Sequence, residues 1–281
     1  MRSVNVFFNK TINLNLTFLI CVLTIAGSYA QGGLLIYPKR LVFDEGKRIE
    51  KVILSNTGEK TTTYSLSFNQ YRMNEFGQFV EIIEPDVGQN FATPFLKLFP
   101  RKVTLEPGES QTVKVQVRRT STMKDGEYRS HLYFRAENDD SPLGERRKKN
   151  NSAGISVKIK ARLGISIATI IKKGASTTVS SITDLNYLKD ENSNHILNFT
   201  INRSGNMSTY GDITVNYISK ENKSYQVANI KGVAVYTPGS LRRIKMLINK
   251  PKNVDFRNGV FKVVYAKNES TSVLSEAVLK L

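Results

Sequence analysis

The segment that most constrains the fold lies at 154–174 and reads GISVKIKARLGISIATIIKKG. Its odd positions from 155 to 171 are almost all apolar, whereas its even positions are mostly small, polar or basic. Such alternation places the two sets of side chains on opposite faces of a β-strand. The pattern persists for about 17 residues, and ordinary strands have about 5–6. One sandwich domain therefore does not need the whole of this strand for its own core.

Two explanations of this length remain open from the pattern alone. In the first, two shorter strands meet at a bend or bulge near Gly164, and both face the core. In the second, the N-terminal half of the strand, Ile155 to Ala161, lies at an open sheet edge and pairs with a strand of another protein, here called the client. An open strand edge with so many apolar side chains favours aggregation. A protein retains it only if a client covers it or if two empty copies pair through it.

The first thirty residues have the pattern of a signal peptide. Two basic residues precede an apolar run at 14–26, and Ser28 and Ala30 are small residues at the positions that a signal peptidase requires. The run is too short to span a bilayer comfortably, and an N-terminal membrane anchor is the alternative. We therefore predict a signal peptide at 1–30 and an exported chain without stable membrane insertion after its removal.

The composition excludes several kinds of site. The only cysteine, Cys21, is removed with the predicted signal peptide, which excludes disulfides, cysteine zinc sites and thiol nucleophiles. The two histidines, His131 and His195, are far apart in the sequence, so we predict no metal site and no cofactor. His131 falls within a strand pattern and is interpreted as an ordinary residue of a sheet.

The charge is strongly basic. The whole chain has a net charge of +17, and the leader contributes two cations and no acid, which leaves +15 for residues 31–281. This charge favours acidic partners. Nucleic acid is not expected as a partner, because the chain is predicted to be exported and has no nucleic-acid-binding motif.

Strand patterns recur along the chain at short spacing, whereas no window shows a clear helical stripe. About seven strands at 34–171, separated by turn residues, are typical of an immunoglobulin-like sandwich. Pro107 and Gly108 between two of them predict a type II turn. We predict an all-β fold of two immunoglobulin-like β-sandwiches in tandem with a cleft between them. The first occupies 31–173 and contains the long strand 155–171, and the second occupies 174–281.

Three segments of the first domain, in order, have a recognisable pattern: YPKRLVFDEG at 37–46, VTLEPGESQTVKVQV at 103–117 and DGEYRSHLYFRAE at 125–137. They resemble the first strand, the Pro-Gly segment and the acidic, arginine-containing strand of the PapD-like periplasmic chaperones of pilus and fimbrial assembly. The long strand then falls where that family has its donor strand. The chain resembles a divergent member.

The resemblance implies a non-enzymatic periplasmic chaperone for pilin-type, β-rich subunits. Such a chaperone completes an unfinished subunit with its donor strand and delivers it to an outer-membrane usher. The side chains that would enter the client are Ile155, Val157, Ile159, Ala161 and Leu163.

The resemblance also implies a basic site for the client's C-terminal carboxylate. Arg40 matches the family's anchor arginine in the first strand, and a guanidinium binds a carboxylate through two parallel hydrogen bonds. The family's second anchor is a lysine late in the donor strand, where this chain has Gly164 or Ala168, depending on the gap. Arg162 and Lys172 are the nearest cations that could replace it.

Two other functions compete with this one. An exported adhesion or matrix protein made of two immunoglobulin-like modules would have a covered strand and no special role for Arg40. An enzyme such as a glycoside hydrolase would need a pair of carboxylates. Glu81, Glu84 and Asp86 lie where a strand ends in a loop, but their spacing does not single out a pair.

Overall fold

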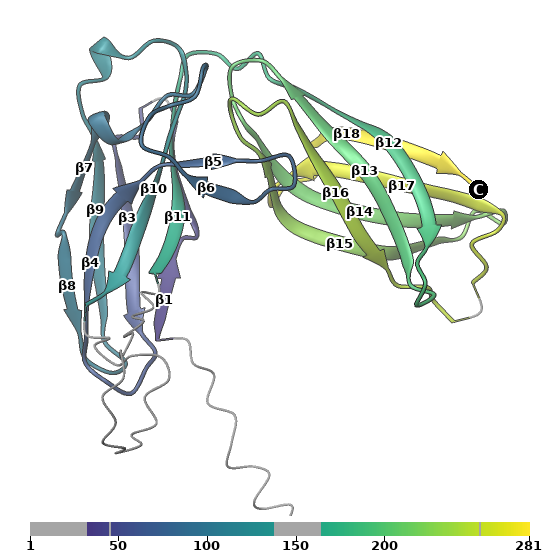
Figure 1. Ribbon diagram of the computed structural model, residues 1–281, viewed down its shortest axis with the longest axis horizontal. Helices are drawn as coiled ribbons and strands as arrows, with labels where there is room; N and C mark the ends of the chain where they lie inside the picture. The colour runs from purple at the N-terminus through teal and green to yellow at the C-terminus, as the bar shows by residue number, and fades with distance from the viewer. Residues whose placement is uncertain (1–32, 45, 138–163, 253) are drawn as a thin grey trace, which may run out of the picture.

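The computed structural model describes residues 33–44, 46–137, 164–252 and 254–281. Within these ranges it has β-strands, two 3₁₀ turns (Thr93–Phe95 and Thr120–Thr122) and no α-helix. The strands form two β-sandwiches, which together give the molecule an L shape (Figure 1). The predicted class, all-β with two immunoglobulin-like sandwiches, is confirmed.

The first sandwich packs a four-stranded sheet, in the order β1-β3-β9-β7, on a five-stranded sheet, in the order β2-β11-β10-β4-β8. Its strands are β1 (Leu34–Tyr37), β2 (Arg40–Phe43), β3 (Ile49–Asn56), β4 (Thr62–Asn69), β7 (Leu96–Phe99), β8 (Lys102–Leu105), β9 (Ser110–Val117), β10 (Gly126–Ala136) and β11 (Gly164–Lys173).

The predicted turn between β8 and β9 is present. Glu109 N donates to Glu106 O at 3.0 Å, and Gly108 has a φ of +76°, a value that a type II turn requires at this position and that glycine adopts without strain. After the turn, Val113, Val115 and Val117 are buried and alternate with more exposed residues. The alternation read from the sequence therefore sets which face of β9 fills the core.

The N-terminal segment 34–43 forms two strands, β1 and β2. β1 lies at the edge of the four-stranded sheet and pairs antiparallel with β3, whereas β2 lies at the edge of the five-stranded sheet and pairs parallel with β11. Pro38 separates the two strands, and proline has no backbone N–H to donate to a ladder. The crossing from one sheet to the other places Arg40 at the start of β2.

The second sandwich has a three-stranded sheet, β12-β13-β16, and a four-stranded sheet, β15-β14-β17-β18. Its strands are β12 (Val179–Lys189), β13 (His195–Ser204), β14 (Thr209–Ser219), β15 (Ser224–Val235), β16 (Leu241–Ile248), β17 (Gly259–Lys267) and β18 (Val273–Lys280). The chain enters it through a short linker at 174–178, where Thr177 N donates to Asn206 Oδ1 at 2.9 Å.

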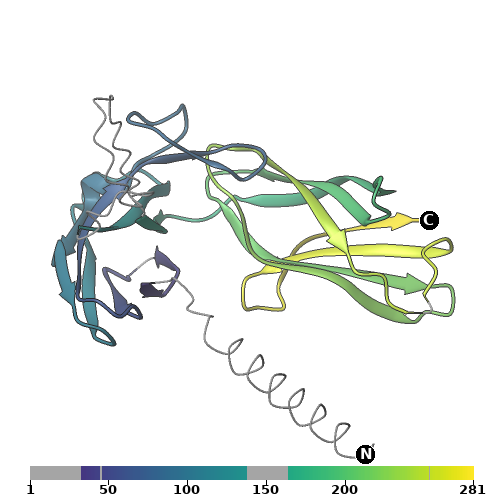
Figure 2. The same cartoon turned by 60° about the horizontal axis from the view of Figure 1, so that its bottom comes forward.

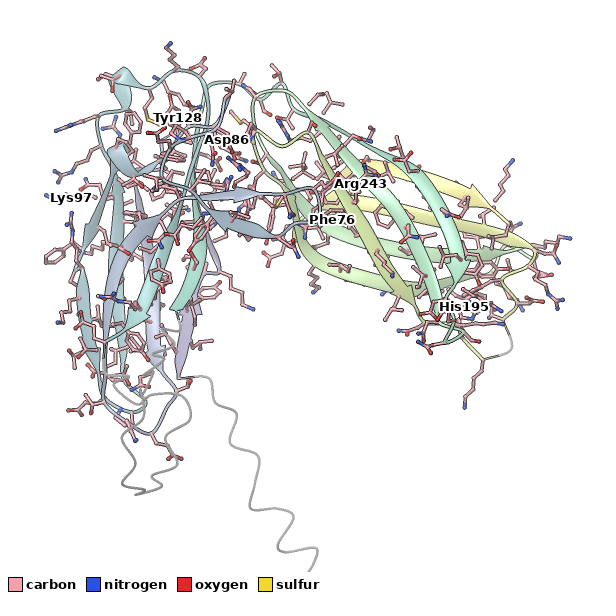
Figure 3. The ribbon with its side chains drawn as sticks, viewed as in Figure 1. Phe76, Asp86, Lys97, Tyr128, His195 and Arg243 are labelled. Carbon is pink, nitrogen blue, oxygen red and sulfur yellow. The ribbon has the colours of Figure 1, made fainter. Side chains whose placement is uncertain are left out.

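A two-stranded arm, β5 (Tyr71–Met73) with β6 (Phe79–Glu81), extends from the first sandwich to the second (Figures 1 and 2). At its tip, Arg243 N of β16 donates to Glu75 O at 2.7 Å, and the Arg243 side chain forms an ion pair with Glu75 at 2.8 Å. Figure 3 shows Phe76 at this tip beside Arg243. The two sandwiches are thus joined by the arm as well as by the linker.

Candidate functional site

Arg40 lies where the two sandwiches meet. Its guanidinium carbon is 4.1 Å from the ring centroid of Tyr210, and its Nη1 donates to the Tyr236 hydroxyl at 2.9 Å. Tyr210 belongs to β14, and Tyr236 follows the last residue of β15. The predicted anchor arginine of the first sandwich is therefore held by two tyrosines of the second.

Ala168 occupies the position next to Arg40. It is registered with Arg40 across the parallel β2/β11 pair and with His131 of β10 on its other side. The residue adjacent to Arg40 is therefore uncharged. Of the two predicted replacement cations, Lys172 lies on the same face of β11 but about 13 Å further along the strand, and its anchoring role stays a prediction. Arg162 lies outside the described residues.

A second cation at this junction is Arg129 of β10, a residue that was not predicted from the sequence. It is two residues from His131 and so lies on the same face of the sheet. Only 2% of its surface is exposed. Its guanidinium carbon is 4.4 Å from the ring centroid of Tyr236, and Nη2 donates to Thr237 O at 3.3 Å. Its Nε and Nη1 have no hydrogen-bond partner among the described residues.

The junction concentrates positive charge. Burial lowers the pKa of Arg129, Tyr236 and Glu127 raise it, and the neighbouring Arg40 lowers it. Glu127 is engaged elsewhere, because it accepts hydrogen bonds from Ser208 N and Oγ. In the described part of the chain, no carboxylate forms an ion pair with Arg40 or Arg129. Two cations that form no ion pair with a carboxylate of the described residues define a candidate site for an anion.

His131 is buried against the same cations. Its ring lies 5.0 Å from that of Tyr71 and 5.2 Å from that of Phe79, both in edge-on geometry. Burial lowers the pKa of His131 to about 3, and the charges of Arg129 and Arg40 contribute to the shift. The histidine is therefore neutral at physiological pH and acts as a packed residue of the sheet.

Because His131 is neutral in the folded protein, we expect the protein to lose stability in acid. Between about pH 3 and 6.5, the unfolded chain takes up a proton at His131 that the folded protein does not, so the free energy of unfolding falls as the pH falls. The slope is about 1.4 kcal/mol per pH unit. Urea unfolding of His131→Gln at several pH values should show a flatter dependence than the unaltered chain, and equal slopes would contradict this assignment.

One edge of β11 is open just before Arg40. β11 pairs with β10 along its whole length, from Gly164 to Lys173, but with β2 only from Ala168 to Ile171. Among the described residues, no strand pairs with the other edge of 164–167. Ile165 on this stretch is 43% exposed. The predicted donor-strand residues Ile155, Val157, Ile159, Ala161 and Leu163 lie outside the described residues.

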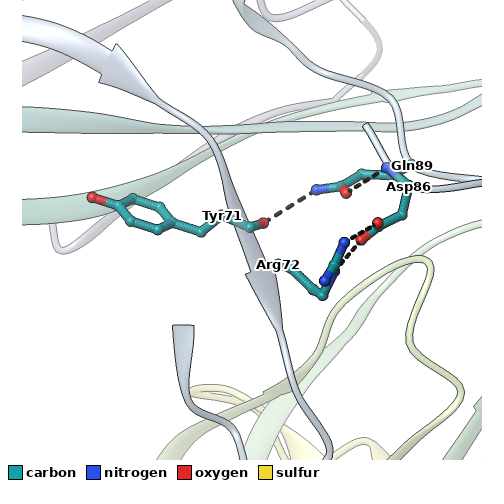
Figure 4. A network of polar contacts seen from close by, with 4 residues as sticks. All are labelled: Tyr71, Arg72, Asp86 and Gln89. Atoms are coloured by element: carbon teal, nitrogen blue, oxygen red, sulfur yellow. Dashed lines mark hydrogen bonds and ion pairs between the residues drawn. The ribbon is translucent and has the colours of Figure 1, made fainter. Parts of the chain in front are cut away.

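Two of the three carboxylates considered for catalysis, Asp86 and Glu81, have structural partners. Arg72 of the arm donates to both carboxylate oxygens of Asp86, while Gln89 bonds the backbone of Tyr71 and Asp86 (Figure 4). The hydrogen bond from Arg72 lowers the pKa of Asp86, and Glu81 accepts a hydrogen bond from Asn69 at 3.1 Å. A general acid needs a raised pKa, so Asp86 is not suited to that role.

No group of three or more His, Cys, Asp or Glu side chains in the described part of the chain is placed to hold a metal ion. No helix in the same part of the chain is long and apolar enough to cross a membrane.

Comparison with known proteins gives structural similarities only. No family model matches the chain, and no curated protein matches it by sequence. Among solved structures, it is similar to CfaA, a chaperone of class 5 fimbriae, with 15% identity and a TM-score of 0.40 over 88% of this chain and 98% of that one. It is also similar to the CupB2 chaperone of Pseudomonas aeruginosa, with 11% identity and a TM-score of 0.41 over 88% of this chain and 100% of that one.

A third similar structure is the CsuC–CsuE chaperone–tip adhesion subunit pre-assembly complex from archaic chaperone-usher pili of Acinetobacter baumannii. The identity is 11% and the TM-score 0.40, over 76% of this chain and 90% of that one. All three of these structures contain chaperones, and the names of two of them mention fimbriae or pili.

Proposed function

We propose that the chain is a non-enzymatic periplasmic chaperone, exported by the signal peptide at 1–30, that binds pilin-type subunits and delivers them to an outer-membrane usher. The observation that supports this proposal best is the open edge of β11, which ends at Arg40. The edge is free to pair with a strand of another protein, and the cation beside it can bind the carboxylate at the end of that strand. Such a pair of features fits recognition of the last strand of another protein.

The direction of β2 supports the same proposal. β2 runs parallel to β11 and begins at Arg40, directly after the open stretch 164–167. A client strand that paired with this stretch in the direction of β2 would end beside Arg40. Its terminal carboxylate could then accept hydrogen bonds from the guanidinium, whereas an internal segment could not supply that charge.

The apolar row of the long strand supplies the other half of the proposed site. Its odd-numbered residues Ile167 and Ile171 fill the core of the first sandwich, and Ile165 continues the same row where it becomes exposed. The predicted donor residues at 155–163 extend this row toward the client. Each buried isoleucine or valine contributes about 1.5–3 kcal/mol. In the absence of a client, two empty copies would cover the same edge by pairing.

The experiment for this proposal is to isolate the exported chain from the periplasm of its native host and to identify what remains bound by mass spectrometry. We expect a small β-rich subunit in a one-to-one complex. Removal of the subunit's last few residues should abolish the complex, because the terminal strand and its carboxylate are the bound parts. A partner that binds equally well without its C-terminus would contradict the proposal.

A further inference from the structure

A hollow of about 560 Å³, here called the terminal hollow, lies at one end of the second sandwich. Figure 3 shows His195, which pairs with the last residue of β12, at this end and away from the first sandwich. β13 extends from His195 to the linker end of the sandwich over 10 residues, or about 30 Å. The terminal hollow is therefore separate from the junction at Arg40. Its lining consists of Lys189 at the end of β12 and of Lys250, Pro251, Val254, Asp255 and Arg257 between β16 and β17.

The wall that precedes β17 is held in place from inside the sandwich. Phe256 is only 4% exposed, and its ring centroid lies 4.8 Å from that of Tyr217. The Tyr217 hydroxyl is hydrogen-bonded to Asp255 O at 2.6 Å and to Asn258 O at 3.1 Å. These contacts fix the backbone on both sides of Phe256. The side chains of Asp255 and Arg257 are therefore presented to the hollow from a fixed support.

The lining of the terminal hollow carries an excess of positive charge. Asp255 forms an ion pair with Arg257 at 2.6 Å and accepts a hydrogen bond from Arg257 N at 3.2 Å. Lys189 and Lys250 form no ion pair with any carboxylate in the described part of the chain. Two positive charges of the lining are thus not neutralised by an ion pair.

His195 lies beside these two lysines. The Tyr187 hydroxyl and His195 Nδ1 share a hydrogen bond of 2.6 Å, and the two rings are stacked with their centroids 5.9 Å apart. Burial lowers the pKa of His195, and the charges of Lys189 and Lys250 lower it further. An anion bound between the lysines would act on the imidazole in the opposite direction. The histidine can therefore be used to detect occupation of the hollow.

We propose that the terminal hollow binds a phosphate group, with Lys189 and Lys250 as its opposite charges and Arg257 as a hydrogen-bond donor. A phosphate ester carries nearly two negative charges at neutral pH, which matches the two lysines, whereas a carboxylate carries one. Lysine binds phosphate as a point charge, and arginine binds it through directed donors. The volume leaves room for the molecule that carries the phosphate. This site lies apart from the open edge of β11 and does not depend on the proposed function.

The test follows the imidazole of His195 by proton NMR between about pH 5 and 8, in the full exported chain without an added histidine tag. His131, the only other histidine, does not interfere, because burial lowers its pKa to about 3. Millimolar inorganic phosphate should raise the pKa of His195 by about half a pH unit or more. Sodium acetate at the same ionic strength should not raise it. An unchanged pKa in phosphate would overturn the proposal.

Lysine variants assign the effect to the terminal hollow. The double variant Lys189→Met, Lys250→Met should show a raised pKa of His195 without phosphate, since two neighbouring cations are removed, and should lose most of the response to phosphate. Both lysines are exposed, so we expect the variant to fold, and each single variant should give an intermediate response. The matched control is Lys231→Met, at an exposed position of β15 outside the hollow, which should respond like the unaltered chain. A full response in the double variant would show that the site is wrongly assigned.

Sedimentation with vesicles distinguishes the two sources of a phosphate group, a soluble phosphorylated compound and the headgroup of an anionic lipid. If the source is a lipid, vesicles of phosphatidylcholine with phosphatidic acid should sediment the unaltered chain but not the double variant, and phosphatidylcholine alone should sediment neither. A chain that responds to free phosphate but stays in solution with both vesicles recognises a soluble compound. Both results support the phosphate site. If a short aspartate peptide raises the pKa of His195 more than phosphate does, the hollow binds an acidic protein segment and the proposal fails.

Discussion

Replacement of Arg40 by alanine will weaken capture of the client about a hundredfold. The guanidinium is proposed to hold the client's terminal carboxylate, and loss of one partner of a buried, hydrogen-bonded charge pair costs about 2–5 kcal/mol. The effect should lie in faster dissociation, since the remaining strand pairing still allows encounter. The measurement is the amount and lifetime of the subunit complex isolated from the periplasm.

Two control variants distinguish this effect from a loss of folding or of general charge. Arg118 is an exposed arginine that bonds only Gln116 with its side chain in the described part of the chain, so Arg118→Ala should capture the client normally. Arg40→Lys keeps the charge but loses the paired donors and should give an intermediate result. If Arg40→Ala captures as much subunit as Arg118→Ala, Arg40 is not the anchor.

Placing an aspartate in the apolar row of the long strand will also abolish capture. Ile165→Asp puts a charge where the row continues from Ile167 toward the client, and Ile159→Asp does so in the predicted donor segment. Each change loses about 1.5–3 kcal/mol of burial and adds the cost of desolvating a carboxylate. We expect the complex to fall below about one per cent of its normal level, as measured by quantitative mass spectrometry of the isolated chaperone.

The matched control is the neighbouring residue on the opposite face. Ser166 is exposed on the same stretch of β11, and its side chain belongs to the even row, which does not enter the client in this account. Ser166→Asp should therefore leave capture nearly unchanged. If Ile165→Asp and Ser166→Asp lose client capture equally, the client does not bind the apolar face of the strand.

The sequence was a good guide to the local structure of the fold because the relevant signals are local. Alternation in β9 identifies its buried valines, and the Pro107–Gly108 pair identifies the turn before it. The crossing at Pro38 was harder to predict. A proline indicates that a ladder is interrupted there, but it does not indicate that the chain continues in a different sheet.

The candidate site was predictable only in part. Arg40 was identified by its place in a motif, whereas Arg129 was overlooked although it lies in another of the same motifs. Its importance comes from the second sandwich, since Tyr236 and Thr237 are what surround it. The sequence indicated the burial of Ala168 and Ile170 only weakly. Both are apolar, and they stand at even positions of a strand whose other even positions are small, polar or basic. They are buried because the second sandwich covers that face.

The most direct test of the central claim is amide hydrogen exchange along 155–167 in the empty chaperone and in its complex with a subunit. Our account predicts that amides on the free edge exchange readily in the empty protein and become strongly protected on binding, together with those of the subunit's last strand. Protection that is already complete in the empty monomer, or that does not change on binding, would show that this edge is not where the client pairs.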